Sequence, residues 1–596
     1  MRHIFKLLPF IRPYWKRSCV ALVLLTSLVF LDLSIPRLIQ RIIDQGITAH
    51  NQDVVIQTAL LMIGISIVSA IIAVGNNIVS VQVGESVARD LRDALFTRIQ
   101  AFSYGNLDEQ NTGQLMVRLT SDTTAVQRVA QVSLRIGTRA PMLMIGSLIL
   151  MVNTNLNLAL TMLPLLLVTS VIIVFFVIKM EPLFHSVQQK LDRLNTVLQE
   201  NIAGARLVKA FVRADFEGGR FEIANEAYTD HSVRVMQIMS SMSPVLTFCV
   251  NIGMVIVIWA GGMQSIRGEL TTGQIVAFTN YLLTTMGPLT MMTMLSNTWA
   301  SGLASAERVN EVLDTLPAVQ DVPAALELSG EHAPQGWLRF EHVSFHYGAA
   351  SLNAADSTTV LDDINLVIEP GQTVAFLGST GAGKTTLINL VPRFYDVTAG
   401  RITLDGIDIR QIKQDSLLAQ IGVVPQETVL FSGTVRDNIR YGVVNASEEQ
   451  VIAAAKAAQA HDFITHLAQG YDTHIEERGI NLSGGQKQRL AIARALITRP
   501  KILILDDSTS SVDVETETKI QDALETQMGS RQHTTLVVAQ RISTVLKADN
   551  IVVIDEGRVA AQGTHAQLMQ TSPIYQEIYE SQLGNGMRLA AEGGQA

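Results

Sequence analysis

The stretch that decides the fold runs Val374-Ala375-Phe376-Leu377-Gly378-Ser379-Thr380-Gly381-Ala382-Gly383-Lys384-Thr385. Its first four residues are apolar and predict the end of a buried strand, and a helical pattern begins near Thr386. Glycines between the strand and the helix allow backbone N–H groups to turn inward around phosphate oxygens at a helix N-terminus. The strand, loop and helix together predict a phosphate loop in an α/β nucleotide-binding domain.

This motif assigns chemistry to individual residues. Lys384 is expected to neutralise the β and γ oxygens of ATP, and the Thr385 hydroxyl is a candidate Mg²⁺ ligand. Asp506 ends the apolar strand Ile502–Leu505 and is expected to hold the metal through water. Tyr347, at the end of an earlier strand, is a candidate platform for stacking adenine. The predicted ATP-binding residues are Tyr347, Gly378, Ser379, Thr380, Gly381, Ala382, Gly383, Lys384, Thr385, Thr386 and Asp506.

The N-terminal half of the chain reads as a membrane region. Mean hydropathy is +0.27, and only 17% of the 596 residues are charged. Apolar runs of about 20 residues suffice to cross a hydrocarbon core of about 30 Å. We predict six transmembrane α-helices with long cytoplasmic extensions, fused to the P-loop α/β domain and its helical subdomain. The six segments are 17–40, 54–82, 134–153, 158–179, 242–265 and 273–299.

Charge predicts the orientation of these segments. The two long polar connections, 83–133 and 180–240, must lie on one side because the other connections are short. Their many basic residues favour the cytoplasmic side, with both termini there too. Short transverse helices at 112–116 and 204–211 are expected to touch the nucleotide-binding domain. The basic residues of the two connections are Arg89, Arg92, Arg98, Arg118, Arg128, Lys190, Arg193, Arg206, Lys209, Arg213, Arg220 and Arg234.

Several protein classes are disfavoured by composition. The net charge of −9 gives no global basic field for nucleic acid. Cys19 and Cys249 both lie in apolar segments, without disulfide or metal-ligand spacing. No signal or transit peptide is recognised before the first segment, which suggests a bacterial cytoplasmic membrane. The expected domains are a transmembrane domain at 1–310 with two coupling loops, a linker at 311–337, a nucleotide-binding domain at 338–580 and a polar tail at 581–596.

A second anion-binding motif is Leu482-Ser483-Gly484-Gly485-Gln486. Ser483 can cap the helix that follows and leave glycine N–H groups free for an anion. Two such sites in one domain suggest that ATP is sandwiched between two copies. With this motif the chain resembles the ATP-binding cassette transporters, over nearly its whole length. Six helices ahead of one cassette match the half-transporter layout of the exporter branch, in which each signature motif (residues 483–486 here) completes the partner's site.

The resemblance implies further roles. Gln426 fits the loop that senses Mg²⁺ and the attacking water, so it joins the predicted ATP-binding residues and, with Asp507 and Gln540, the predicted catalytic positions. The metal set becomes Thr385, Gln426 and Asp506. Asp513 fits the D-loop, and Glu477-Arg478-Gly479 fits the exporter-type X-loop. The chain is thereby expected to be an ABC-type ATPase coupled to transport, with ATP and Mg²⁺ as cofactors.

Two positions depart from the family pattern. The family has Glu after the metal-site Asp and His in the switch loop, whereas this chain has Asp507 and Gln540. Asp507 is one methylene shorter, and a misplacement of about 1 Å can cost roughly 10²-fold in rate. Gln540 cannot become positively charged, and single donors to developing charge are worth roughly 10² to 10³. We therefore predict a degenerate site and a heterodimer whose partner supplies the Glu and the His. The alternative is tolerated drift in an active enzyme.

The transported substrate is less determined. The resemblance favours amphipathic drugs or lipids moved outward, with peptides next, and an exporter fold can also import metal complexes. Many methionines in the last two segments suit varied hydrophobic ligands, although methionine is also ordinary membrane core. Asp32, Arg135 and Arg139 could face a cavity, pair with one another or snorkel. A different class is an ATP-gated regulator or channel, and a membrane-anchored soluble-type ATPase is a further alternative.

Overall fold

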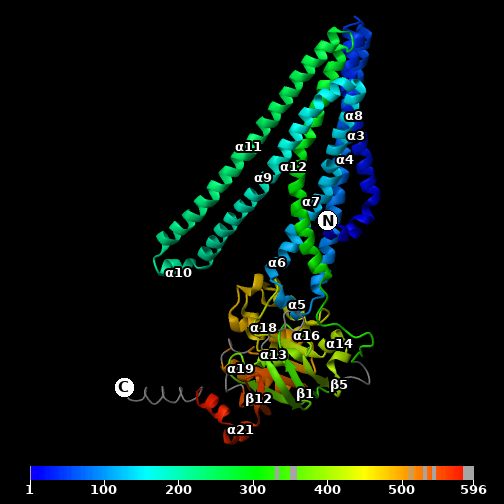
Figure 1. The fold of residues 1–596 in the computed structure, drawn as a ribbon. Helices are drawn as coiled ribbons and strands as arrows, with labels where there is room; N and C mark the ends of the chain where they lie inside the picture. Colours follow the sequence, from blue (N-terminus) through cyan, green and yellow to red (C-terminus); the bar gives the residue numbers. More distant parts are fainter. Residues whose placement is uncertain are drawn as a thin grey trace. The chain divides into compact units, whose positions relative to one another are not determined.

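The computed structural model describes residues 2–328, 334–348, 359–508, 512, 514–527, 533–539 and 545–581. The chain divides into two compact units (Figure 1). Unit 1 consists of Met1–Gln100 and Gly113–Thr315, and unit 2 of Ala101–Thr112 and Leu316–Ala596. A short segment of the N-terminal half therefore packs with the C-terminal half.

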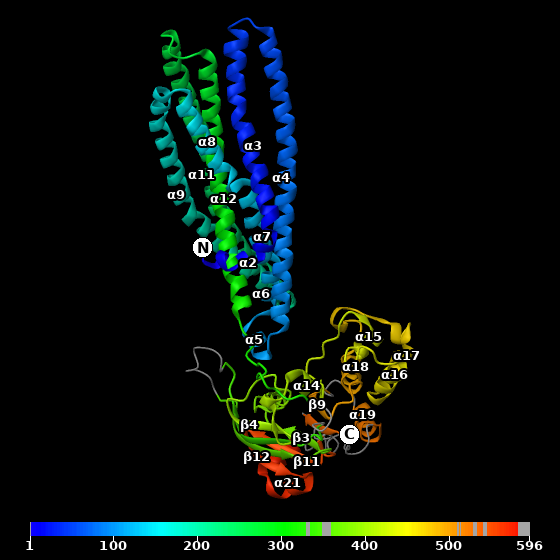
Figure 2. The same ribbon diagram turned by 90° about the vertical axis from the view of Figure 1, so that its right-hand side faces the viewer.

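Unit 1 is built of long helices. Helices α3 and α4 pack side by side, as do α9 and α11 (Figures 1 and 2). Short helices precede α3. The elements are α1 (Arg2–Lys6), α2 (Leu8–Ile11), η1 (Arg12–Tyr14), α3 (Trp15–Arg41), η2 (Ile42–Ile47), α4 (Gln52–Gln100), α6 (Thr112–Val117), η3 (Arg118–Asp122), α7 (Thr123–Val132), η4 (Ser133–Gly137), α8 (Arg139–Thr154), α9 (Leu156–Ala203), α10 (Ala205–Ala210), α11 (Ala214–Ile266) and α12 (Thr272–Asp314).

Among the described residues, five helical stretches are long and apolar enough to cross a membrane. They contain the first five predicted segments, and their bounds are Leu8–Ile47, Gln52–Gln100, Thr112–Thr154, Leu156–Ala203 and Ala214–Ile266. The sixth predicted segment, 273–299, lies inside the continuous helix α12, and its crossing stays a prediction.

The two halves of helix α4 differ in the exposure of their apolar side chains. In its first half, Leu60, Ile63 and Ile71 are exposed, as expected for side chains that face lipid. In its second half, apolar residues at helical spacing, including Val87 and Leu91, are fully buried against neighbouring helices. The predicted cytoplasmic extension is therefore one continuous helix to Gln100.

Unit 2 contains a mostly parallel six-stranded sheet in the order β12-β11-β3-β10-β9-β6, in which only β12 is antiparallel to its neighbour. An antiparallel sheet has the order β2-β1-β4-β5. Because β3 and β9 both pair in parallel with β10, the phosphate loop and Asp506 leave the sheet at the same edge. The strands are β1 (Leu338–Phe345), β2 (Leu361–Ile368), β3 (Thr373–Leu377), β4 (Ala399–Leu404), β5 (Ile407–Asp408), β6 (Ile421–Val424), β7 (Gly433–Thr434), β8 (His474–Ile475), β9 (Ile502–Asp506), β10 (Thr534–Val538), β11 (Asn550–Asp555) and β12 (Arg558–Gly563).

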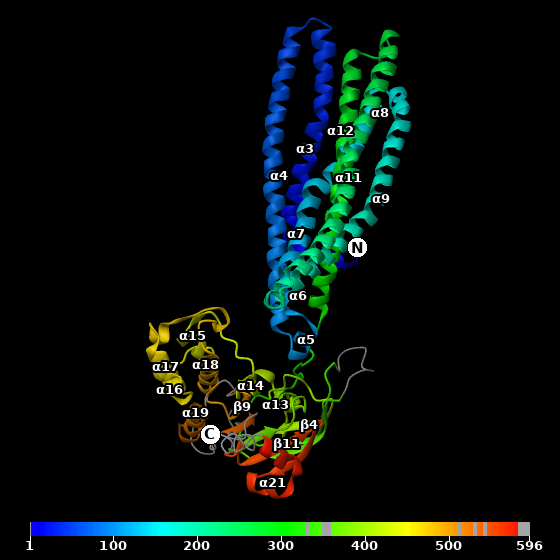
Figure 3. The same cartoon turned by 90° about the vertical axis from the view of Figure 1, so that its left-hand side faces the viewer.

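A helical lobe stands beside the sheets and has its own apolar core (Figure 3). It is formed by α15 to α18 with the short strands β7 and β8, which matches the predicted helical subdomain. The helices of unit 2 are α5 (Tyr104–Glu109), α13 (Lys384–Leu390), η7 (Ile409–Gln411), α14 (Gln414–Leu418), α15 (Val435–Arg440), α16 (Glu448–Ala457), α17 (His461–His466), η8 (Gly470–Asp472), η9 (Glu477–Gly479), α18 (Gly484–Leu496), α19 (Val514–Gln527) and α21 (His565–Thr571).

Helix α5, Tyr104–Glu109, is a segment of the N-terminal half that packs in unit 2. Short helices occupy both stretches where transverse helices were expected, as α6 and α10, and their contact with the nucleotide-binding domain stays a prediction. The Tyr104 ring stacks on Phe394 with centroids 4.0 Å apart, and the Tyr395 hydroxyl donates to Asp108 at 2.5 Å. Aromatic stacking and a hydrogen bond therefore hold α5 in unit 2.

Candidate nucleotide-binding site

The phosphate loop requires glycine at defined positions. Gly378 follows β3 with φ of 149°, and Gly383 precedes α13 with φ of 100°. A Cβ atom at Gly378 would lie 2.1 Å from the carbonyl oxygen of Ile554 on the neighbouring strand β11. The loop can therefore turn closely under β11 only without a side chain at this position.

Lys384 is held over the same loop. Its Nζ donates to the carbonyl oxygens of Gly378 at 3.0 Å and Ser379 at 2.8 Å. Burial lowers the pKa of the Lys384 ammonium, and the nearby carboxylates of Asp506 and Asp507 oppose this change. The arrangement concentrates backbone N–H groups and one cation in a small concave loop, which suits a polyphosphate.

Asp506 and Thr385, the two predicted metal ligands next to the phosphate loop, contact each other. Asp506 is only 5% exposed, and Thr385 Oγ1 donates to its Oδ1 at 3.0 Å. Burial raises the pKa of Asp506, whereas the hydrogen bond from Thr385 lowers it. A hydroxyl and a carboxylate are hard oxygen ligands of the kind that Mg²⁺ takes together with phosphate oxygens. The residues present thus fit a Mg²⁺ ion held jointly by protein and nucleotide.

These residues line one cavity of about 940 Å³. Of the predicted ATP-binding residues, Ala382 alone does not line it, because its side chain is buried in the core beneath the loop. The segment after α21 also lines the cavity, and no sequence motif predicts this. Its lining residues are Ile574, Glu577, Ile578 and Ser581. The other lining residues are Tyr347, Val360, Leu377, Gly378, Ser379, Thr380, Gly381, Gly383, Lys384, Thr385, Thr386, Gln426, Asp506, Asp507, Val538, Ala539, Ile554 and Asp555.

Tyr347 is fixed at the wall of this cavity. Its hydroxyl lies 2.9 Å from Thr386 Oγ1, and its ring meets Phe345 and Tyr395 edge-on, with centroids 4.9 Å and 5.4 Å apart. The side chain nevertheless stays 41% exposed. A ring that is held in place but remains partly exposed at the cavity wall suits a role in stacking.

Asp507 lies in the cavity next to Asp506. It is 9% exposed, and its backbone N–H donates to the carbonyl oxygen of Val538 at 3.1 Å. Its φ of 46° is left-handed, a conformation that Asp tolerates better than most residues. Gln540 and Asp513 lie outside the described residues, so the expectations for the switch loop and the D-loop stay predictions.

The signature motif begins α18 as predicted. Ser483 Oγ accepts a hydrogen bond from the Gln486 N–H at 3.3 Å, and the Ser483 N–H donates to Gln486 Oε1 at 2.9 Å. This capping box leaves Ser483 and Gly484 exposed. Among the described residues that line the cavity, none belongs to 483–486. The motif is therefore presented outward, away from the chain's own nucleotide cavity.

The chain was compared with known proteins. Residues 18–289 match the family described as ABC transporter transmembrane region, and residues 361–510 match the family described as ABC transporter. An uncharacterized ABC transporter ATP-binding protein of Bacillus subtilis, YfiB, is 38% identical over 97% of this chain and 98% of its own. An ATP-dependent lipid A-core flippase of Syntrophus aciditrophicus is 37% identical, over 97% and 94%.

A solved structure is similar along the whole chain. The structure of a bacterial Atm1-family ABC exporter with ATP bound has a TM-score of 0.79 and 28% sequence identity. The match covers 95% of this chain and 98% of that one. Both units described above therefore have counterparts in that structure.

Proposed function

Because the chain belongs to the ABC transporters and has both their transmembrane region and their ATP-binding domain, we propose that it is one subunit of a heterodimeric exporter. The protein is an ATP-driven ABC exporter, an ATPase coupled to transport across a membrane. We propose further that two different chains form the exporter and that their two ATP sites hydrolyse ATP at very different rates. In it, this chain binds ATP in its own cavity and hydrolyses it weakly.

The observation that carries the proposal is Asp507. It lines the nucleotide cavity beside Asp506, where the family pattern has the longer Glu as the base for the attacking water. Gln540 replaces the switch His in the sequence. The residues for holding ATP are meanwhile complete, from Tyr347 through the phosphate loop to Asp506, and Thr385, Gln426 and Asp506 are the proposed protein ligands of Mg²⁺. This chain is therefore proposed to bind ATP in its own cavity without hydrolysing it efficiently.

The outward presentation of the signature motif supports the second half of the proposal. Residues 483–486 are intact and do not line this chain's own cavity. They are proposed to complete the ATP site of a partner half-transporter that has the catalytic Glu and the switch His. The complex would then have one ATP site that hydrolyses ATP efficiently and one that hydrolyses it slowly.

The proposed substrates are hydrophobic or amphipathic molecules, drugs or lipids, moved out of the cytoplasm or the inner leaflet. Similarity to lipid A-core flippases over nearly the full chain favours lipids. The membrane is proposed to be a bacterial cytoplasmic membrane, with both termini in the cytoplasm, because the basic residues gather in the two long connections.

Replacing Asp507 with alanine tests the weak site directly. The turnover of the complex is expected to change by less than about twofold, because chemistry at this site contributes little when the partner's site is intact. The same change at the partner's Glu is expected to abolish turnover. Steady-state phosphate release from the purified complex measures both. A loss of more than tenfold in Asp507→Ala would refute the division of work.

Replacing Lys384 with alanine tests ATP binding by this chain. Loss of the charge-assisted contacts to the phosphates, worth about 2 kcal/mol, is expected to weaken ATP binding roughly 30-fold. Photolabelling of the two separable subunits with azido-ATP measures the loss on this chain alone. Lys413→Ala is the matched control, since Lys413 forms an exposed ion pair with Glu327 away from the cavity. Equal labelling of Lys384→Ala and the parent protein would contradict the assignment.

A further inference from the structure

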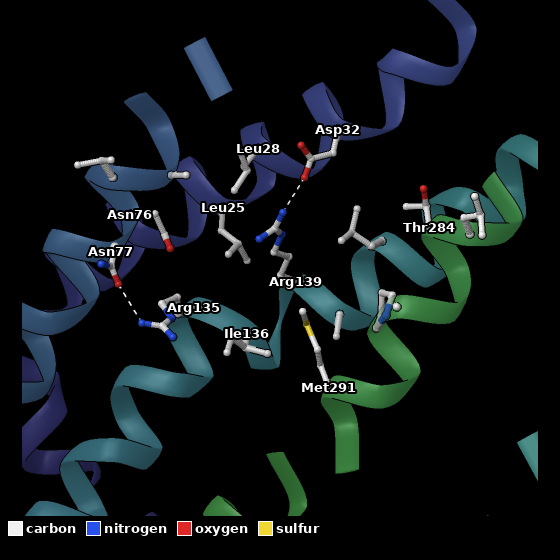
Figure 4. A pocket seen from close by; sticks show the side chains of 17 residues that line it. Leu25, Leu28, Asp32, Asn76, Asn77, Arg135, Ile136, Arg139, Thr284 and Met291 are labelled. Atoms are coloured by element: carbon white, nitrogen blue, oxygen red, sulfur yellow. Dashed lines mark hydrogen bonds and ion pairs between the residues drawn. The ribbon is translucent and has the colours of Figure 1, made fainter. Parts of the chain in front are cut away.

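A second cavity lies inside unit 1, among α3, α4, η4, α8 and α12 (Figure 4). Its volume is about 830 Å³, within the usual range of small-molecule sites. Most of its lining is apolar, as in Leu25, Leu143 and Met291. The ionisable lining residues are three: Asp32, Arg135 and Arg139.

The two arginines differ in their partners. Arg139 Nη2 donates to Asp32 Oδ2 at 2.8 Å, so one positive charge is balanced. Arg135 Nη1 donates to Asn77 Oδ1 at 3.0 Å, and an amide oxygen carries no formal charge. Among the residues that the structure describes, no carboxylate forms an ion pair with Arg135. The cavity therefore keeps one positive charge in excess, and the buried Nε of Arg139 has no hydrogen-bond partner.

The backbone beneath Arg135 is unusual. Residues Ser133–Gly137 form the π-helix η4 between α7 and α8. Such segments are rare and frequently occur at functional sites. An ionisable side chain in a membrane-spanning region is costly and typically marks the path of a ligand. Arg135 therefore lies in the π-helix and also carries the charge that no carboxylate balances.

A basic excess recurs in a separate cavity of unit 1. This cavity, of about 910 Å³, has Arg92, Arg128 and Arg308 in its lining and a single carboxylate, Asp122. Asp122 accepts from Arg308 Nη2 at 2.5 Å, so two positive charges are unbalanced there. The π-helix η3 supplies part of its lining. Both cavities of the same helical unit therefore favour anions over cations.

We propose that the cavity around Arg135 binds an anionic amphiphile, with the phosphate or carboxylate head group on the Arg135 guanidinium and Arg139 beside it in the cavity lining. The alkyl part lies against the apolar wall formed by residues such as Leu28, Leu143 and Leu283. This deepens the function proposed above and rests on it, since it names the substrate class of the exporter. Asp32 has a positioning role, because it holds Arg139 and sets the charge of the cavity.

Photo-crosslinking of the full chain with a defined probe tests this assignment. The protein is placed in nanodiscs of zwitterionic phosphatidylcholine without ATP and labelled with a dodecyl phosphate that carries a diazirine on its tail. Label is expected on peptides from α3, α8 and α12. Arg135→Gln is expected to reduce it about tenfold through loss of a charge-assisted contact, and Arg135→Lys is expected to retain most of it.

Two further variants test whether the charge of the cavity determines the labelling. Asp32→Asn is expected to raise labelling severalfold, because it adds a second unbalanced charge. Arg267→Gln, in an exposed turn away from the cavity, is expected to leave labelling unchanged. Equal labelling of all four variants would overturn the proposal, and so would a fall with Asp32→Asn while Arg135→Gln stays at the parent level.

Competition distinguishes the class and source of the ligand. Unlabelled dodecyl phosphate is expected to displace the probe, whereas dodecanol and dodecyltrimethylammonium at the same concentration are not. If inorganic phosphate competes as well as dodecyl phosphate, the alkyl chain adds nothing to binding, and the proposal of an amphiphilic ligand is wrong. ATP-driven movement of a neutral fluorescent amphiphile is followed separately in vesicles that contain this chain together with its partner. If this movement persists while the labelling is not selective for anions, the present inference fails and the exporter function stands. Absence of ATP-driven movement of any amphiphile would refute the exporter function instead.

Discussion

Purified without a second chain, the protein is expected to hydrolyse ATP about 10³-fold more slowly than the proposed complex with a partner half-transporter. The shortened carboxylate of Asp507 and the uncharged Gln540 each account for roughly 10² in rate. Residues that act as one unit do not lose rate additively, so the product of the two factors is an upper limit.

The measurement compares two preparations through the same affinity tag on this chain. One comes from a heterologous host that expresses this chain alone, and the other from native membranes, in which the co-purified subunit is identified by mass spectrometry. Both must bind ATP to comparable occupancy before rates are compared. A turnover of the isolated chain within threefold of the complex, and sensitive to Asp507→Ala, would show that this site is a competent one.

The substitution Gly484→Asp in this chain is expected to reduce the turnover of the complex by about 10² to 10³. Gly484 is the first residue of α18 and is exposed. A carboxylate there favours the helix through the N-terminal dipole, so the fold should not suffer. The same charge repels the γ-phosphate that the partner's site must hold against this helix end.

Gly484→Asn is the matched control for this prediction. It has nearly the same size as the aspartate variant but no charge, so most of the loss should disappear if repulsion is its cause. ATP binding by the chain's own cavity should persist in both variants, since 483–486 do not line that cavity. Full turnover of the complex with Gly484→Asp would mean that this signature motif completes no working site.

Local motifs were the predictable part of the molecule. The phosphate loop, the strand that ends in Asp506 and the capping box at Ser483 each depend on neighbours in the sequence, and the structure contains all three. The long helices followed in the same way from apolar runs and from the buried spacing of residues such as Val87 and Leu91.

Contacts between distant residues were not predictable in this way. The docking of Tyr104 on Phe394 depends on packing across almost three hundred positions of sequence, and no local motif predicts it. The lining of the nucleotide cavity by Glu577 has no motif at all. Sequence left three alternatives open for Asp32, Arg135 and Arg139, and only the coordinates distinguish the paired arginine from the one that faces a neutral amide.

Tyr395 links two parts of unit 2 that have different tasks. Its hydroxyl binds Asp108 of α5, and its ring meets Tyr347, the proposed adenine platform. The chain on both sides of α5 belongs to unit 1. Binding free energies at two coupled sites must change one another by equal amounts. A transported molecule that shifts α5 would therefore alter the affinity for ATP, and ATP would alter the affinity for that molecule by the same factor. Tyr395 is the residue through which such reciprocal coupling would act, since it contacts both α5 and Tyr347.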